Sequence, residues 1–247
     1  MINNNRYLRN IIVPECGEKG QDLLKNAKVF VVGAGGLGSA VLFYLVAAGV
    51  GNIFILDSDT IELSNLQRQI LYREKDIDKS KAILTLKRLK ELNSDINIKV
   101  KNTRANNENL KTLAKDYGII VDCSDNFDTR YLINKFAFEN NKTLVFAAVK
   151  NFIGQCATFK SFIATNPCYC CFNSSVKEEN LPLPVLEKGI IGAVAGNLGT
   201  MQAIAVIKEI LMLNTSYNSI LMVDFLKNSF RNVAVNKNNL CTVCSLI

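Results

Sequence analysis

The chain of 247 residues contains no histidine. Histidine is the side chain that enzymes use most often as a general acid or base near neutral pH. Any chemistry that this protein performs must therefore depend on positioning and charge, or use aspartate, lysine, tyrosine or cysteine.

Two further features are missing, a dense basic run and an export signal. Lysine and arginine outnumber the acidic residues and give a formal net charge of +7, but they are not clustered. We therefore expect an acidic partner or a polyphosphate ligand, and no nucleic acid. The polar residues Asn3, Asn4, Asn5 and Arg6 precede any apolar run, so we expect no signal peptide and a cytoplasmic protein.

One uncharged apolar stretch, residues 189–207, is long enough to be considered as a membrane span. Several glycines interrupt it, it contains Asn197 and Gln202, and Lys208 and Glu209 follow it directly. We therefore predict a buried helix that packs on a sheet, and no membrane partner.

The strongest motif begins with residues 29–32, which are apolar and mostly β-branched and so predict a buried parallel strand. The pattern Gly33-x-Gly35-x-x-Gly38 follows, and apolar residues then recur at helical spacing. Such a turn binds phosphate, because glycine permits close backbone approach and the new helix supplies free N–H groups. A second strand ends at Asp57, where a ribose-binding carboxylate is expected. Together these features predict a nucleotide site without distinguishing a redox cofactor from a phosphate donor.

A polar loop follows the second strand, at the edge where open α/β sheets place ligand contacts. Within it, Ser64 is expected to cap a short helix over residues 65–71. A longer helix is predicted to start near residues 79–82, and taken alone Lys81 would be an ordinary solvated lysine. The apolar stripe predicted for this helix consists of Ala82, Ile83, Leu86 and Leu89.

Strands and helices alternate up to residue 149. The later strands of this part are expected at residues 96–100, 119–121 and 144–149. This alternation predicts an α/β fold with a doubly wound, mainly parallel, Rossmann-like sheet whose two faces are covered by helices. An antiparallel extension is expected from residues 154–159, 220–225 and 230–235.

A second pair of acids, Asp122 and Asp125, follows the strand at residues 119–121. Doubly wound topology places the end of this strand beside the glycine turn. Asp125 could bind magnesium through its carboxylate, or it could cap the helix that begins near Phe127. The residues alone leave both roles open.

Four of the eight cysteines form two C-x-x-C pairs, Cys168 with Cys171 and Cys241 with Cys244. In a chain without an export signal, cysteines favour thiols or metal ligands over disulfides. Four thiolates at this spacing suit tetrahedral zinc, which predicts a zinc-binding C-terminal part. Two unrelated thiol pairs or a redox dithiol are the alternatives. Cys170 is expected to be spare, because it is adjacent to Cys171.

These motifs occur in the order typical of one enzyme family. The sequence resembles the ThiF/MoeB/HesA family, the prokaryotic relatives of ubiquitin-activating enzymes, over essentially the whole chain. The motifs that carry the resemblance are Arg6-Tyr7-Leu8-Arg9, the glycine turn at residues 33–38, Leu56-Asp57-Ser58-Asp59, Leu63-Ser64-Asn65-Leu66-Gln67-Arg68-Gln69, Lys81, Asp122-Cys123-Ser124-Asp125-Asn126 and the paired C-x-x-C.

The resemblance implies ATP-dependent adenylation of the C-terminal glycine of a small ubiquitin-like sulfur-carrier protein that ends in Gly-Gly. Pyrophosphate would be released, and the product would serve thiamine or molybdopterin synthesis. The resemblance also implies one adenylation domain over residues 1–247. Its nucleotide-binding half would cover about 1–150, and its carrier-binding and zinc-binding half about 151–247.

Residue roles follow from the same resemblance. Arg9, Arg68, Lys81 and Asp125 would be catalytic, with Asp125 holding magnesium and Asp57 the ribose. Arg9 would reach the phosphates in a neighbouring subunit, which implies a homodimer. The nucleotide contacts would be Gly33, Gly35, Gly36, Gly38, Asp57, Asp59, Ser64, Asn65, Leu66, Gln67, Arg68, Lys81, Asp125 and Asn126. The zinc ligands would be Cys168, Cys171, Cys241 and Cys244.

One departure concerns a cysteine that some family members carry before the long buried helix and link covalently to the carrier. Val185 stands at about that position here. We therefore expect no covalent carrier intermediate through this position, and a separate protein as the sulfur donor.

Three other functions fit part of the pattern. A family relative could adenylate a peptide instead of a sulfur carrier. A nicotinamide-dependent oxidoreductase would explain the glycine turn and Asp57 but would leave Arg68, Lys81 and Asp125 without roles. A nucleotide-sensing or adaptor protein would bind ATP without exchanging pyrophosphate.

Overall fold

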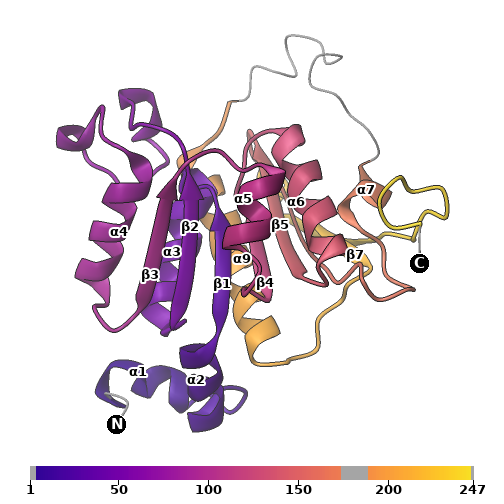
Figure 1. Ribbon diagram of the computed structural model, residues 1–247, viewed down its shortest axis with the longest axis horizontal. Helices are drawn as coiled ribbons and strands as arrows, with labels where there is room; N and C mark the ends of the chain where they lie inside the picture. The colour runs from indigo at the N-terminus through magenta and orange to yellow at the C-terminus, as the bar shows by residue number, and fades with distance from the viewer. Residues whose placement is uncertain (1–3, 174–188, 246–247) are drawn as a thin grey trace.

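The computed structural model describes residues 4–173 and 189–245, arranged around one eight-stranded sheet (Figure 1). The strands are β1 (Lys28–Val32), β2 (Asn52–Asp57), β3 (Asn97–Asn102), β4 (Ile119–Asp122), β5 (Thr143–Lys150), β6 (Ile153–Phe159), β7 (Ser219–Asp224) and β8 (Ser229–Ala234). The α-helices are α1 (Asn4–Ile11), α2 (Gly17–Asn26), α3 (Gly36–Ala48), α4 (Lys81–Leu92), α5 (Asn107–Leu113), α6 (Phe127–Glu139), α7 (Tyr169–Phe172) and α9 (Gly192–Ile210). Two 3-10 turns are η1 (Leu63–Asn65) and η2 (Glu74–Asp76).

The strand order is β3-β2-β1-β4-β5-β6-β7-β8. The first five strands in this order are parallel, and β6, β7 and β8 continue the sheet antiparallel. The predicted parallel sheet with an antiparallel extension is confirmed. The winding direction reverses between β1 and β4, which are adjacent, so this position is the switch point at which open α/β sheets bind ligands.

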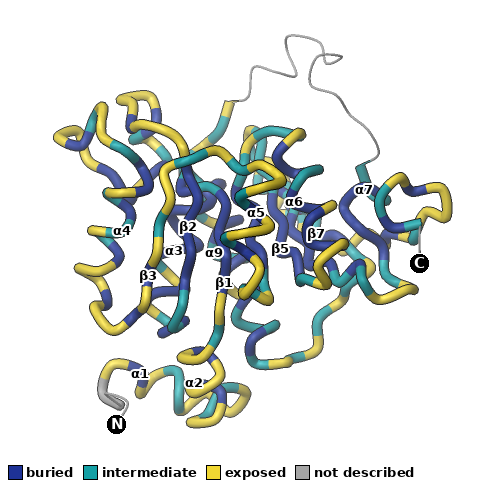
Figure 2. Tube along the Cα trace, in the orientation of Figure 1, coloured by how far each residue is buried: buried dark blue, intermediate teal, exposed yellow. Residues whose placement is uncertain are grey.

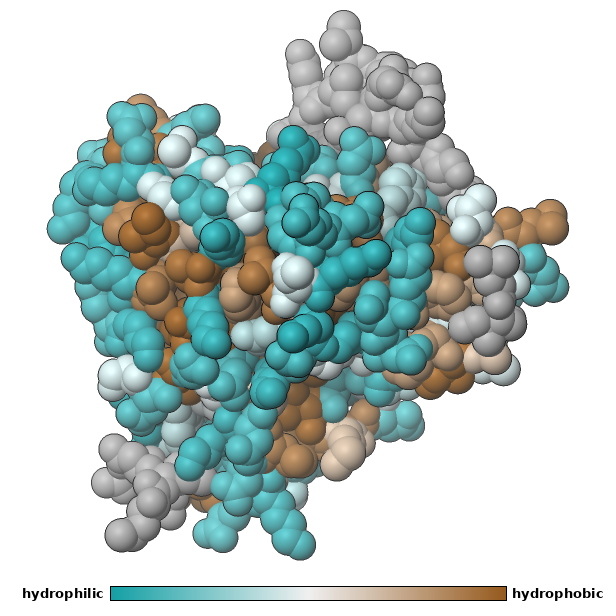
Figure 3. Space-filling view, viewed as in Figure 1, coloured by the Kyte–Doolittle hydropathy of each residue, from teal (hydrophilic) through white to brown (hydrophobic). Residues whose placement is uncertain are grey.

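Helices cover both faces of the parallel part of the sheet. One core layer joins β1 and β2 to α3, α4 and α9, and a second layer joins the opposite face to α5 and α6. Figure 2 shows the central strands as the buried part of the chain. On the face viewed in Figure 3, apolar side chains gather between α4 and α5, while the helices themselves present mainly hydrophilic groups.

The uncharged stretch before residue 208 forms α9, which packs along α3 and against β5. Gly199 permits the close approach of the two helices, because a Cβ there would lie 2.4 Å from the carbonyl oxygen of Leu37. The predicted buried helix is confirmed. Within the part of the chain that is described, no helix is long and apolar enough to cross a membrane.

Two local predictions are wrong. Ser64 caps no helix over residues 65–71; it lies inside η1, and turns follow because the Asn65 carbonyl accepts from the N–H groups of Arg68 and Gln69. Ile83 is 60 % exposed and does not belong to the buried stripe of α4. The buried face includes Thr85 in its place, because the hydroxyl of Thr85 has a buried hydrogen-bond partner in Tyr72.

Candidate active site

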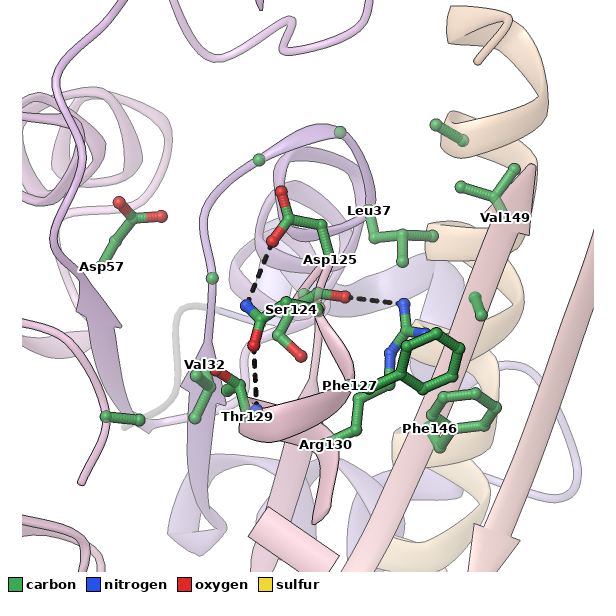
Figure 4. Close-up of a pocket in the computed structure, with 18 of the residues that line it drawn as sticks. Val32, Leu37, Asp57, Ser124, Asp125, Phe127, Thr129, Arg130, Phe146 and Val149 are labelled. Atoms are coloured by element: carbon green, nitrogen blue, oxygen red, sulfur yellow. Dashed lines mark hydrogen bonds between the residues drawn. The ribbon is translucent and has the colours of Figure 1, made fainter. Parts of the chain in front are cut away.

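A cavity of about 600 Å³ opens at the carboxyl ends of β1, β2 and β4. Figure 4 shows Asp57 on one side of it and Arg130, Phe127 and Phe146 on the other, with Ser124 and Asp125 between them. The cavity therefore spans the switch point of the sheet, and the described residues of two different loops face each other across it.

The glycine turn forms the floor of this cavity, and two of its glycines cannot be replaced without strain. Gly33 has φ +96°, and a Cβ there would lie 2.7 Å from the carbonyl oxygen of Cys123. A Cβ on Gly38 would lie 2.1 Å from the carbonyl oxygen of Gly33. Gly35 and Gly36 line the cavity at the start of α3, where first-turn N–H groups and the helix dipole favour an anion.

Asp57 is buried at the end of β2 and fastens this turn. Its Oδ2 accepts from the N–H of Ala34 at 2.7 Å, and its Oδ1 accepts from the N–H of Asp59 at 2.9 Å. Burial raises the pKa of the Asp57 carboxyl, while these two N–H groups act in the opposite direction. Each carboxylate oxygen has a second lone pair, so Asp57 can still accept from a ribose hydroxyl.

The carbonyl of the same Ala34 peptide is held from the other side. The buried Tyr72 hydroxyl donates to the Ala34 carbonyl oxygen at 2.9 Å and lies 3.0 Å from Oγ1 of Thr85. Ala34, between Gly33 and Gly35 of the turn, is thus fixed through both its N–H and its C=O. Sequence reasoning missed Tyr72, because nothing in its spacing relates it to the turn.

Lys81 is the first residue of α4, and its side chain is only 6 % exposed. Its Nζ lies 2.9 Å from Oδ2 of Asp59, which is itself exposed at the cavity. The interpretation of Lys81 as an ordinary solvated lysine is therefore wrong. A backbone hydrogen bond joins the same two residues, since the N–H of Lys81 donates to the carbonyl of Asp59 at 3.0 Å.

Arg68 reaches the cavity from the loop between β2 and α4. One terminal nitrogen of its guanidinium donates to the carbonyl of Ser64 at 3.0 Å. The start of α9 is pressed against this loop, because a Cβ on Gly192 would lie 2.2 Å from the carbonyl oxygen of Gln67. The loop that carries Arg68 is thereby held on the cavity.

The expected nucleotide contacts divide into two groups. The structure brings one group together on the cavity wall: Gly33, Gly35, Gly36, Asp57, Asp59, Arg68, Lys81, Asp125 and Asn126. A second group lies beside the cavity but not on its wall, within the described residues: Gly38, Ser64, Asn65, Leu66 and Gln67. Asn65 is buried, and its Oδ1 has no hydrogen-bond partner among the described residues. Arg9 is exposed on α1, which lies near the amino ends of the strands, whereas the cavity lies at their carboxyl ends (Figure 1).

Asp125 and Asn126 have different roles at the start of α6. Asn126 is the cap, because its Oδ1 accepts from the N–H of Thr129 at 2.9 Å. Asp125 precedes the cap, is exposed at the cavity and accepts from Nδ2 of Asn126 at 3.3 Å. Asn126, and not Asp125, is therefore the N-cap of α6, and Asp125 lines the cavity.

Arg130 is a second residue that sequence reasoning missed. It is 9 % exposed and lines the cavity one turn after the cap of α6. Its guanidinium donates to the carbonyl of Ser124 at 3.2 Å and lies 5.4 Å and 5.6 Å from the ring centroids of Phe127 and Phe146. Its place four residues after Asn126 was the available signal, since that spacing returns a helical side chain to the same face.

The four paired cysteines come together at a cluster of their own and do not line this cavity. Cys168 and Cys241 have their sulfur atoms 3.6 Å apart, Cys171 and Cys244 3.3 Å, and all four sulfurs lie within 4.8 Å of one another. Tetrahedral zinc with Zn–S bonds of about 2.3 Å requires sulfur atoms about 3.8 Å apart. The donor set and spacing therefore fit a structural zinc site. Cys170 is outside this group, and its sulfur accepts from Nδ2 of Asn134 at 3.3 Å.

Comparison with known proteins places these features in one family. Residues 7–243 match the ThiF family. The chain is 39 % identical to the sulfur carrier protein adenylyltransferase of Thermus thermophilus, covering 97 % of this chain and 90 % of that protein. It is 37 % identical to the adenylyltransferase and sulfurtransferase MOCS3 of Xenopus laevis, covering 97 % of this chain and 53 % of that protein. It therefore spans about half the length of this second relative.

A solved structure agrees with the sequence comparison. The crystal structure of E. coli MccB with ATP superposes with a TM-score of 0.84 at 28 % identity, covering 98 % of this chain and 75 % of that one. The family match extends over nearly the whole chain, and its motifs meet at one cavity. The chain belongs to the ThiF family.

Proposed function

We propose that this protein uses ATP to adenylate the C-terminal carboxylate of a small sulfur-carrier protein that ends in Gly-Gly. The observation that carries the proposal is the cavity at the switch point, whose wall includes a glycine turn, a buried carboxylate and the cations Arg68 and Lys81. The name of the Thermus relative supplies the substrate class, because 39 % identity extends over 97 % of this chain.

This chemistry needs no histidine. A terminal carboxylate has a pKa of about 3.3–3.7 and is already ionised at neutral pH. One of its oxygens attacks the α-phosphorus of ATP, the bond to the β-phosphate breaks, and pyrophosphate leaves with its electron pair. No proton moves in this step, so the protein has to align the reactants and neutralise phosphate charge.

The residues divide this work between them. Asp57 holds the ribose, and the start of α3 receives the phosphates above Gly35 and Gly36. Arg68 and Lys81 neutralise phosphate charge, supported by the buried Asn65. Lys81 is already fixed by Asp59 at 2.9 Å, so its position does not depend on the nucleotide.

Magnesium is assigned to Asp125. A carboxylate exposed at a polyphosphate site is the type of ligand that magnesium uses, usually with phosphate oxygens and water completing its shell. The fit rests on two observations: Asp125 faces the cavity, and Asn126 performs the capping. Bound magnesium would neutralise charge on the phosphates.

Arg9 is assigned to a second subunit. It is exposed on α1, which lies near the amino ends of the strands, whereas the cavity of its own chain lies at their carboxyl ends (Figure 1). In a homodimer, mixing Arg9→Ala and Asp125→Ala chains would leave one site with both defects and one intact site. Separately tagged mixed dimers should therefore recover up to half of the wild-type activity. Mixed dimers no more active than either parent would refute the assignment.

We infer one domain over residues 1–247, with the zinc site on the carrier-binding half at about 151–247. Zinc here is structural, since four cysteine ligands leave no open position for a substrate. Sulfur comes from a separate donor protein. The sequence prediction concerning Val185 lies outside the described residues.

ATP–pyrophosphate exchange tests the proposed function. Carriers of the thiamine type and of the molybdopterin type, each ending in Gly-Gly, should be compared with the same carriers lacking the last glycine. If exchange occurs with one type of carrier and is lost when its last glycine is removed, the result supports the proposal and shows which pathway the protein serves. Arg68→Ala should lower the exchange rate by about 10²-fold, because it removes a phosphate-stabilising charge. ATP binding without exchange for any carrier would support an adaptor instead.

A further inference from the structure

Arg130 is a buried cation that forms no direct ion pair within the described part of the protein. No carboxylate of residues 4–173 or 189–245 pairs with it, and its Nε has no hydrogen-bond partner there. The other buried cation of the cavity, Lys81, is paired with Asp59 at 2.9 Å. A buried guanidinium without a carboxylate partner is costly, so such a group is retained where a ligand completes its contacts.

The surroundings of Arg130 hold its guanidinium in one place. The Ser124 carbonyl accepts one N–H at 3.2 Å, and the rings of Phe127 and Phe146 lie against the guanidinium at 5.4 Å and 5.6 Å. Asp122, at the end of β4, is a buried acid: burial raises the pKa of its carboxyl, and the charge of Arg130 acts in the opposite direction. Its Oδ1 accepts from the N–H and hydroxyl of Ser124 at 2.9 Å and 2.6 Å, and no hydrogen bond joins it to Arg130. Only the contact with Ser124 is a hydrogen bond of the Arg130 guanidinium among the described residues, and Arg130 lines the cavity.

The position of Arg130 distinguishes it from the nucleotide contacts. Asp57 stands at the end of β2, whereas Arg130 comes from α6 and lies against Phe146 of β5, across the switch point (Figure 4). A nucleotide with its ribose at Asp57 and its phosphates above the glycine turn leaves the Arg130 side of the cavity to the second substrate. That substrate presents a carboxylate, for which a guanidinium fork is the best-matched partner.

We propose that Arg130 binds the C-terminal carboxylate of the carrier and orients one of its oxygens toward the α-phosphorus of ATP. The inference rests on the proposed function and adds a catalytic residue to it. One carboxylate oxygen stays on the guanidinium, and the other forms the new bond to phosphorus while the bond to pyrophosphate breaks. The oxygen on Arg130 becomes the carbonyl oxygen of the acyl adenylate.

The test separates carrier binding from nucleotide binding in the full-length protein. Arg130→Gln should lower kcat/KM for a Gly-Gly carrier by about 10²-fold in pyrophosphate exchange, the effect of losing a charge-assisted hydrogen-bond pair. Its Kd for ATP, measured without carrier, should stay within about 2-fold of the wild-type value. Arg130→Lys should recover part of the loss, because it keeps the charge but not the fork.

Lys135→Gln is the matched control. It removes one positive charge from the exposed side of the same helix, where Lys135 pairs with Glu139, and should leave both parameters unchanged. Zinc content and far-ultraviolet circular dichroism of the Arg130 variants check their folding.

Each outcome decides one point. Wild-type exchange with equally active Arg130→Gln would overturn the inference alone. Equal losses in ATP affinity and carrier kcat/KM would also overturn it, because they would assign Arg130 to the structure of the whole cavity. A wild-type protein inactive with every carrier would refute the proposed function, and with it the inference.

Discussion

Tyr72→Phe should destabilise the protein and weaken nucleotide binding by removing a single oxygen atom. The hydroxyl of Tyr72 connects Oγ1 of Thr85 at 3.0 Å with the carbonyl of Ala34 at 2.9 Å, and all three residues are buried. Phenylalanine would leave both partners buried without a hydrogen bond. Each such group costs about 1–3 kcal/mol, so for the two together we expect a loss of about 2–6 kcal/mol in the free energy of unfolding.

Thr85→Val provides the comparison. This variant removes the Thr85 hydroxyl but leaves Tyr72 donating to Ala34. We therefore expect a smaller loss, about 1 kcal/mol in the free energy of unfolding, and normal ATP affinity. The double variant should lose less than the sum of the two, because the unpaired threonine hydroxyl is absent.

Urea unfolding followed by circular dichroism measures the stability, and calorimetric titration with ATP measures the affinity. In a chain of this size each 1 kcal/mol corresponds to about 2–4 °C in Tm. A Tyr72→Phe protein with wild-type stability and wild-type ATP affinity would refute the idea that Tyr72 fixes the glycine turn. If Thr85→Val lost as much ATP affinity as Tyr72→Phe, the hydrogen bond from Tyr72 to Ala34 would not be what supports nucleotide binding.

The remaining predictions concern charge, the cap and zinc. Lys81→Ala should lower pyrophosphate exchange by about 10²-fold, and normal turnover would remove it from the mechanism. Asp125→Ala should abolish magnesium-dependent turnover without changing Tm, whereas Asn126→Ala should cost about 0.5–2 kcal/mol of stability by calorimetry, as loss of a cap does. Cys241→Ser should release zinc and lower Tm, while Cys170→Ser should retain about one equivalent by metal analysis; metal-free wild-type protein, freshly purified and reduced, would contradict the site.

Local sequence patterns predicted the features that depend on neighbouring residues. The strand, glycine turn and helix around Gly33 are one continuous segment, and the steric demands of Gly33 and Gly38 arise within that segment and the adjoining β4. Asp57 was predictable for a related reason, because β2 pairs with β1 in register and ends beside the turn.

The errors arose where tertiary contacts override local preference. Ser64 had the chemistry of a cap, but the start of α9 packs on this loop through Gly192, more than a hundred residues away. Ile83 had the hydrophobicity of a core residue, yet Thr85 takes the buried position because Tyr72 satisfies its hydroxyl. Arg130 was missed because its burial depends on contacts with the rings of Phe127 and Phe146, and Phe146 belongs to another element of the fold.

The cysteine cluster can assemble only late in the synthesis of the described residues, because its two pairs are far apart in the sequence. The strands β1 to β5 all precede residue 151, whereas the cluster needs cysteines separated by 73 positions. At a synthesis rate of about 5–20 residues per second, about 4–15 s pass between the appearance of Cys171 and that of Cys244. During this interval the parallel sheet is available to fold while the first pair of thiols stands without the second. A metal ion that needs all four thiols would therefore be bound only after β1 to β5 have been synthesised.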